Sequence, residues 1–130
     1  MAGGQTRIEI RGFKDLEVWQ VAMRLVGECY HVSRSFPDSE RFGLTNQLRR
    51  SAVSVPSNIS EGHGRGSPKS FINFLWIANG SLAELETQVL LSIDLGFVST
   101  SDASATLDLI GQVGRMLTGL RHAVEKTLPP

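Results

Sequence analysis

Cysteine is nearly absent from this sequence of 130 residues, which contains Cys29 alone. One cysteine cannot form an internal disulfide, and no pair of cysteines or histidines has the spacing of a metal site. The first residues, MAGGQTRIEIRG, lack the apolar core of a signal peptide, and no apolar run approaches the length of a membrane span. We therefore expect a cytoplasmic protein with no cofactor, no metal and no membrane segment.

Net charge is also absent, because 13 lysines and arginines balance 13 aspartates and glutamates. A hydrophobic content of 41% and a charged content of 20% are typical of a globular protein, and the length fits one domain. The charge is unevenly distributed, with a net of +4 over residues 41–70, called the basic segment below, and −3 over residues 71–130. A polyanion would therefore approach the middle of the chain first.

Apolar residues recur at steps of three and four, which predicts amphipathic helices. The first predicted helix runs from an N-cap at Asp15 to the turn that contains Pro37. The second begins at Leu44. We expect Gly62 and Gly64 to end it, because glycine readily adopts the left-handed conformation of a helix C-terminus.

Pro56 lies inside the second predicted helix. Its ring removes one backbone donor and collides with the carbonyl group of Ala52, so we expect a kink at this point. The short polar side chains of Ser54, Ser57 and Asn58 could hydrogen-bond to the freed backbone. Pro56 and Asn58 are therefore assigned structural roles.

Two more helices follow, each with a serine at its predicted start. Ser67 is the expected N-cap of the third helix, Pro68 occupies its first position and Gly96 ends it. The fourth helix is expected to begin near Ser99 and to end before Pro129.

Four helices joined by short connections predict an all-α protein, an up-down-up-down four-helix bundle. We place this bundle domain at residues 13–128 and treat residues 1–12 as a flexible N-terminal tail. Only residues 6–10, TRIEI, have a pattern that could form a strand, and we leave them in the tail.

The start of the third helix, FINFLWIA from Phe71 to Ala78, is apolar on almost every side. Three neighbouring helices can cover only one face of it, which would leave Ile72 and Trp76 toward water. One interpretation is a wide core face, and the other is a subunit interface. We favour the interface.

The loop GHGRGS superficially resembles a phosphate-binding loop, but it follows a helix and lacks the sequence that ends the Walker motif. A more modest possibility is anion binding at the start of the third helix, where Arg65 and Lys69 flank the first backbone amides. The alternative is a solvated connection with no ligand.

A catalytic triad is not predicted, although its residue types occur together. Ser57, Ser60, Glu61 and His63 are close neighbours at a helix end, where a held base and an oxyanion hole are rarely both available. We therefore predict that the protein is not an enzyme.

Adjacent arginines in the second helix point about 100° apart. One of them, assigned as Arg50, is expected to pair with Glu84 or Glu86 and to stabilise the bundle, so Glu84 is also assigned a structural role. The other would face outward and contact phosphate groups together with the remaining cations of the basic segment. The candidate nucleic-acid-binding residues are Arg41, Arg49, Arg65 and Lys69.

Three stretches carry a family resemblance, namely FKDLEVWQVAMRL, FGLTNQLRRSAVSVPSNISEGHGR and FLWIANGSLAELETQVLLSIDLG. Over roughly residues 13–96 the chain resembles the bacterial four-helix bundle proteins of the 23S rRNA intervening-sequence family. The resemblance implies a ring-shaped homopentamer. It also implies structural roles for Asn58, Glu61 and Gly62, in the second helix and its exit turn. Asn79 departs from the pattern, since a basic residue is common at that position.

The resemblance further implies kinship with the accessory variability protein of diversity-generating retroelements, which is pentameric and binds nucleic acid and a reverse transcriptase. Our leading hypothesis is a non-enzymatic, homo-oligomeric bundle that presents a basic surface to RNA or DNA. The alternative is an adaptor that binds another protein, such as a reverse transcriptase, and never contacts nucleic acid. The kinship and the basic segment favour the first, whereas the zero net charge and Asn79 favour the second.

Overall fold

The computed structural model describes residues 12–130, so most of the predicted N-terminal tail lies outside the described residues. The four helices are α1 (Glu17–Ser33), α2 (Leu44–Gly64), α3 (Pro68–Asp94) and α4 (Thr100–Glu125). Two short 3-10 turns, η2 (Phe13–Asp15) and η3 (Asp38–Glu40), precede α1 and α2. Residues 12–130 contain no strand, and none of their helices combines the length and hydropathy needed to span a membrane.

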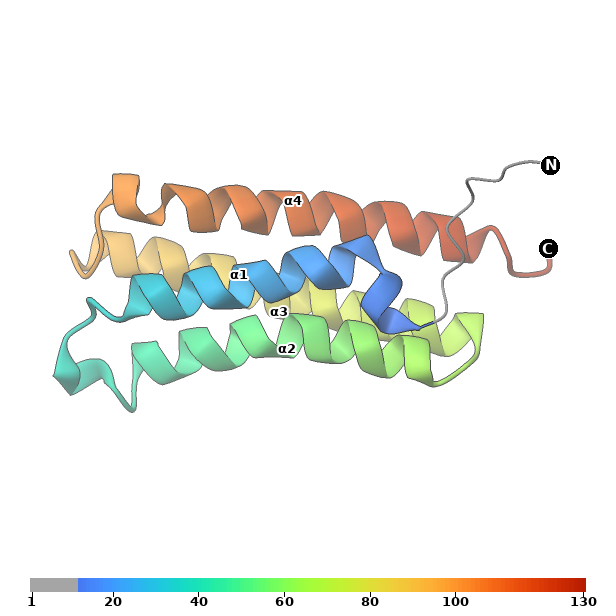
Figure 1. Ribbon diagram of the computed structural model, residues 1–130, viewed down its shortest axis with the longest axis horizontal. Helices are drawn as coiled ribbons and strands as arrows, with labels where there is room; N and C mark the ends of the chain where they lie inside the picture. Colours follow the sequence, from blue (N-terminus) through green and yellow to red (C-terminus); the bar gives the residue numbers. More distant parts are fainter. Residues whose placement is uncertain (1–11) are drawn as a thin grey trace.

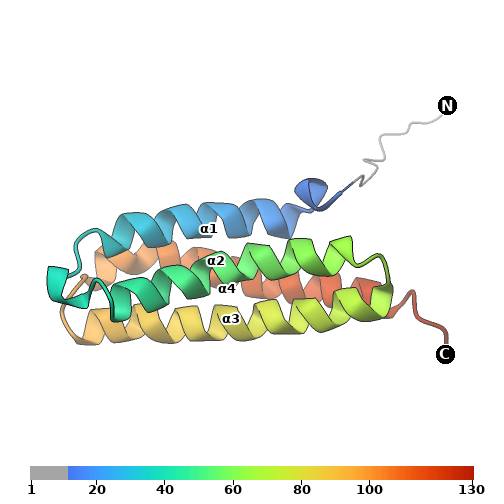
Figure 2. The ribbon, with the colours of Figure 1, turned by 90° about the horizontal axis from the view of Figure 1, so that it is seen from below.

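The helices run antiparallel to their neighbours along the chain, and each packs against two others (Figure 1). α1 contacts α2 and α4, α3 contacts α2 and α4, and the start of α1 lies at the same end as the end of α4 (Figures 1 and 2). The predicted all-α four-helix bundle is confirmed. Its core is made of aliphatic side chains from all four helices, of which the largest fully buried ones are Leu25, Leu48, Ile59, Leu75, Leu85 and Leu117.

The helix starts of α3 and α4 follow the sequence prediction. The Ser67 hydroxyl accepts a hydrogen bond from the Ser70 amide at 3.2 Å, and Pro68 opens α3. The Ser99 hydroxyl accepts one from the Asp102 amide at 3.1 Å. Each serine thus satisfies one of the amides that have no partner within the helix.

The start of α1 was predicted incorrectly. Asp15 belongs to the preceding turn η2, and the N-cap position is occupied by Leu16, whose side chain cannot accept a hydrogen bond. Leu16 is buried in the core instead. The N-cap position of α1 is therefore occupied by a buried apolar residue.

The end of α2 differs from the prediction in a way that concerns Gly62. α2 continues to Gly64, and the glycine with a positive φ is Gly66, at 79°. Gly62 is a buried helical residue, where an added Cβ would lie 2.5 Å from the Cβ of Phe74 in α3. Its structural role is therefore to allow α2 and α3 to approach closely, and not to end the helix.

α2 continues through Pro56 as one helix (Figure 2). Pro56 is buried, and nearby Asn58 donates hydrogen bonds from Nδ2 to the Ser54 carbonyl at 2.8 Å and to the Ser54 hydroxyl at 2.9 Å. The Ser54 hydroxyl also bonds to that of Ser81 in α3 at 2.8 Å. Asn58 thus has a structural role, but its amide contacts Ser54 rather than the carbonyl of Ala52.

Candidate nucleic-acid interface

Three of the four predicted cations lie at the two ends of α2. Arg41 follows η3 in the connection before α2, whereas Arg65 and Lys69 lie in and just after the connection to α3. Because α2 has 21 residues, its ends are about 30 Å apart. The basic segment of the sequence therefore does not form one continuous patch on a single subunit.

At the α2–α3 end, Arg65 and Lys69 are both exposed but differ in their surroundings. Arg65 forms an ion pair with Glu61 at 2.8 Å, and its guanidinium carbon lies 5.0 Å from the ring centroid of Phe74. Lys69 has no ion-pair partner among residues 12–130. Exposed pairs contribute little stability, but Glu61 still offsets the charge that Arg65 presents. Lys69 is therefore the uncompensated cation at this end.

Arg49 was expected to face outward, yet it lies at the contact between α1 and α2. Its Nε donates a hydrogen bond to the Ser33 hydroxyl at 2.8 Å, and its guanidinium carbon lies 4.6 Å from the Tyr30 ring centroid. The side chain is half-buried. These contacts assign Arg49 to the α1–α2 contact rather than to an open phosphate site.

Arg50 also differs from its predicted role. The ion pairs within residues 12–130 are Glu61–Arg65 and Arg121–Glu125, so Arg50 pairs with neither Glu84 nor Glu86. Arg50 is exposed. Adjacent side chains of an α-helix point about 100° apart. Arg49 is therefore directed toward α1, and Arg50 is directed away from it. Arg49 thus makes a contact between helices, to α1 rather than to α3, and Arg50 is the exposed arginine of the two.

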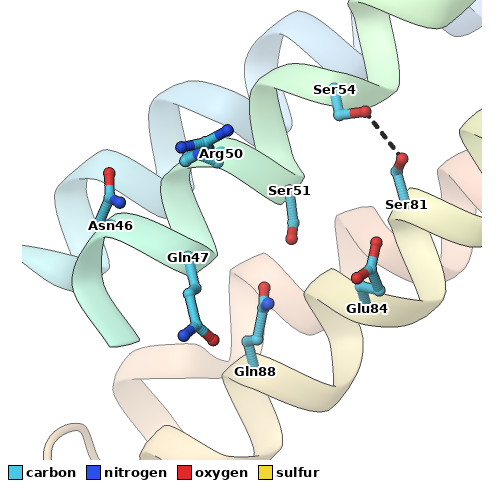
Figure 3. Close-up of a pocket in the computed structure, with 8 residues that line it drawn as sticks. All are labelled: Asn46, Gln47, Arg50, Ser51, Ser54, Ser81, Glu84 and Gln88. Atoms are coloured by element: carbon cyan, nitrogen blue, oxygen red, sulfur yellow. Dashed lines mark hydrogen bonds between the residues drawn. The ribbon is translucent and has the colours of Figure 1, made fainter. Parts of the chain in front are cut away.

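A polar groove of about 470 Å³ lies between α2 and α3 (Figure 3). Figure 3 shows the α2 side chains Gln47 and Ser51 pointing toward Gln88 of α3. The Gln88 Oε1 atom is buried and has no hydrogen-bond partner among residues 12–130. The groove is lined by Asn46, Gln47, Arg50, Ser51, Ser54, Ser81, Glu84 and Gln88. The groove offers both hydrogen-bond donors and hydrogen-bond acceptors. The charges of its one arginine and one glutamate balance.

The apolar segment at the start of α3 leaves Trp76 exposed by 50%, while Ile72 is only partly exposed. The guanidinium carbon of Arg121 lies 3.9 Å from the Trp76 ring centroid, which joins α4 to α3. Sequence periodicity missed further exposed apolar residues on α3 and at its C-terminal end, namely Ile77, Leu90, Leu91 and Leu95. Ile77 and Leu91 are 14 residues apart, but the heptad position between them is Glu84, so the sequence shows no apolar stripe through these two residues.

Sequence reasoning also missed Phe42, which is 84% exposed in the connection between η3 and α2. The guanidinium carbon of neighbouring Arg41 lies 5.0 Å from its ring centroid. Phe42 falls outside every helical stripe, so periodicity carries no signal for it. An aromatic residue beside Gly43, in a segment of charged residues, was the available clue.

The serine, acidic and histidine side chains considered above as a catalytic triad do not contact one another. Ser60 donates its hydroxyl hydrogen to the Ser57 carbonyl at 2.9 Å, Glu61 binds Arg65, and the His63 ring packs edge-on against Phe71. Residues 12–130 contain no group of three or more acidic, histidine or cysteine side chains that could hold a metal.

Cys29 lies in the core of the bundle, away from any of these surfaces. Burial, together with the negative charge of Glu28, raises the pKa of its thiol to about 12. Because the thiolate is the reactive form, this cysteine is a packing residue rather than a nucleophile.

The family model described as 23S rRNA-intervening sequence protein matches residues 14–119. The chain belongs to this family. Among solved structures, a protein of unknown function from the S23 ribosomal protein family of Bacteroides thetaiotaomicron is similar, with a TM-score of 0.74 and 20% identity. The similarity covers 80% of this chain and 97% of that one, and it establishes the shared fold. No curated protein matches the sequence.

Proposed function

We propose that this family member is a non-enzymatic homo-oligomer that binds RNA or DNA through exposed cations on α2, in the connection before it and in the first turn of α3. The observation that carries the proposal is that Arg41, Arg50 and Lys69 are exposed and have no ion-pair partner among residues 12–130. Unpaired surface cations are free to neutralise phosphates and release condensed counterions. The family description, which refers to a sequence inserted in 23S rRNA, supports a nucleic acid as the partner.

Assembly would turn these scattered charges into a polyvalent surface. The family resemblance favours a ring of five subunits, and the exposed Trp76 on α3 supplies apolar surface for a subunit contact. In such a ring every exposed cation is repeated around the axis. Several weak phosphate contacts would then act together, which raises the overall affinity without any new kind of contact.

Binding through phosphates predicts a steep dependence on salt and little sequence preference. We would replace both Arg50 and Lys69 with glutamine and measure affinity for a fluorescent oligonucleotide by anisotropy at several salt concentrations. The slope of log affinity against log salt should fall by about 0.9 for each duplex phosphate that the variant no longer neutralises. Arg115→Gln is the matched control, because Arg115 is exposed but lies on α4, outside the basic segment. It should leave the slope unchanged.

A protein adaptor is the second candidate, and the exposed apolar residues on α3 are the observation that favours it. Light scattering should give a mass of several subunits of 14.2 kDa each under the leading proposal. Trp76→Glu and Ile72→Glu should reduce that mass, because burying an unpaired carboxylate is costly. Absence of binding to any nucleic acid at about 50 mM salt, where the phosphate contribution is strong, would support the adaptor instead.

A further inference from the structure

We propose that Phe42 and Arg41 form a stacking site for an unpaired nucleobase, an inference that rests on the nucleic-acid binding proposed above. Phe42 is 84% exposed, the largest exposed fraction among the large hydrophobic residues of residues 12–130. Its ring makes no aromatic contact there. The ring therefore contributes little to the packing of the subunit and leaves a π-face open to solvent.

Arg41 supplies the second half of the site. Its guanidinium carbon lies 5.0 Å from the Phe42 ring centroid, and it has no ion-pair partner among residues 12–130. A nucleotide presents a flat base and a negative phosphate within one residue, so an aromatic face beside an unpaired guanidinium matches both groups.

The backbone around Phe42 is held by hydrogen bonds. The Arg41 amide donates to the Asp38 carbonyl at 3.1 Å, and the Gly43 amide donates to the Glu40 carbonyl at 2.9 Å. The Glu40 carboxylate accepts a bond from the Leu44 amide at 3.0 Å, at the start of α2. That acidic group is thereby directed to the helix amide rather than to Arg41. A fixed turn reduces the ordering cost of binding a base.

Within its own segment of the chain, the Phe42 ring is an isolated apolar group. Residues 38–43 contain no other exposed large hydrophobic residue, and they include Asp38, Glu40 and Arg41. Protein interfaces surround an aromatic anchor with further contacts that exclude water. A base needs only the ring face and a nearby cation. Because paired bases are stacked inside a duplex, the site selects single-stranded RNA or DNA.

The test compares Phe42→Ala with wild type on a fluorescent single-stranded oligo(dT) and on a blunt DNA duplex. Removal of one stacking interaction per bound strand should weaken single-strand binding by about 5- to 150-fold. Duplex affinity and the salt slope should not change, because no phosphate contact is removed. Phe42→Tyr should bind as wild type does. Leu95→Ala, at another apolar residue exposed by 56%, is the control and should also bind normally.

The outcomes separate this inference from the proposed function. If Phe42→Ala binds the single strand normally while the Arg50 and Lys69 double variant binds weakly, the stacking site is wrong and nucleic-acid binding stands. If Phe42→Ala instead lowers the mass measured by light scattering, Phe42 is a subunit contact and the inference is overturned. If the wild type binds no nucleic acid, both proposals fail.

Discussion

The close approach between α2 and α3 gives a quantitative test of the fold at Gly62. An added Cβ there would lie 2.5 Å from the Cβ of Phe74 and 3.2 Å from Cδ1 of Phe71. The first of these atoms is fixed to the backbone, so Gly62→Ala would force the two helices apart. Overpacking of this kind typically costs about 1–3 kcal/mol. The higher helix propensity of alanine recovers up to about 1 kcal/mol of that.

Gly27→Ala is the matched control, because Gly27 lies within α1 and an added Cβ would have no neighbour within 4 Å. It should gain the helix propensity of alanine without the clash, and the difference between the two variants therefore isolates the steric cost. We expect Gly27→Ala to exceed Gly62→Ala by about 1–3 kcal/mol in free energy of unfolding. Urea unfolding followed by circular dichroism, at one protein concentration, measures this difference. Equal stabilities would refute the proposed role of Gly62.

Three further predictions test other contacts. Arg49→Gln should lower the free energy of unfolding by about 1–2 kcal/mol, since it removes a hydrogen bond and a cation–π contact, whereas Arg50→Gln should change it by less than about 0.5 kcal/mol. An equal decrease for both in urea unfolding would contradict the contacts of Arg49. Pro56→Ala should raise the unfolding free energy by about 1 kcal/mol, as a gain of about 3 kcal/mol in helix propensity is offset by the removal of two buried methylenes. A less stable variant in the same assay would show that the ring packing dominates. The thiol of Cys29 has an ordinary pKa of 9.0, and burial raises it to about 12 in the folded protein. The unfolded chain therefore loses this proton at a lower pH than the folded chain does, so the free energy of unfolding should fall as the pH rises between these two values. Cys29→Ala should flatten this part of a pH–stability profile, and an unchanged slope would count against the burial of the thiol as its cause.

The helices and most of their boundaries were predictable because they depend on residues close together in the chain. Ser67 and Ser99 cap α3 and α4 as expected, since an N-cap bond spans only three residues. Leu16 shows the limit of such rules. It occupies the N-cap position of α1 that the sequence assigned to Asp15, and it is buried in a core that depends on the other helices.

The sequence by itself determined the apolar stripes, the caps and the order of the helices, and hence the bundle, because each follows from spacing within one segment. Only the tertiary structure decided what the side chains contact. The rotation of α2 about its axis directs Arg49 to Tyr30 and leaves Arg50 unpaired among residues 12–130. The length of the same helix separates Arg41 from Lys69, although both belong to one basic stretch of the sequence. Contacts between helices depend on their relative rotation and distance, and neither quantity is encoded in the spacing of residues along a single helix.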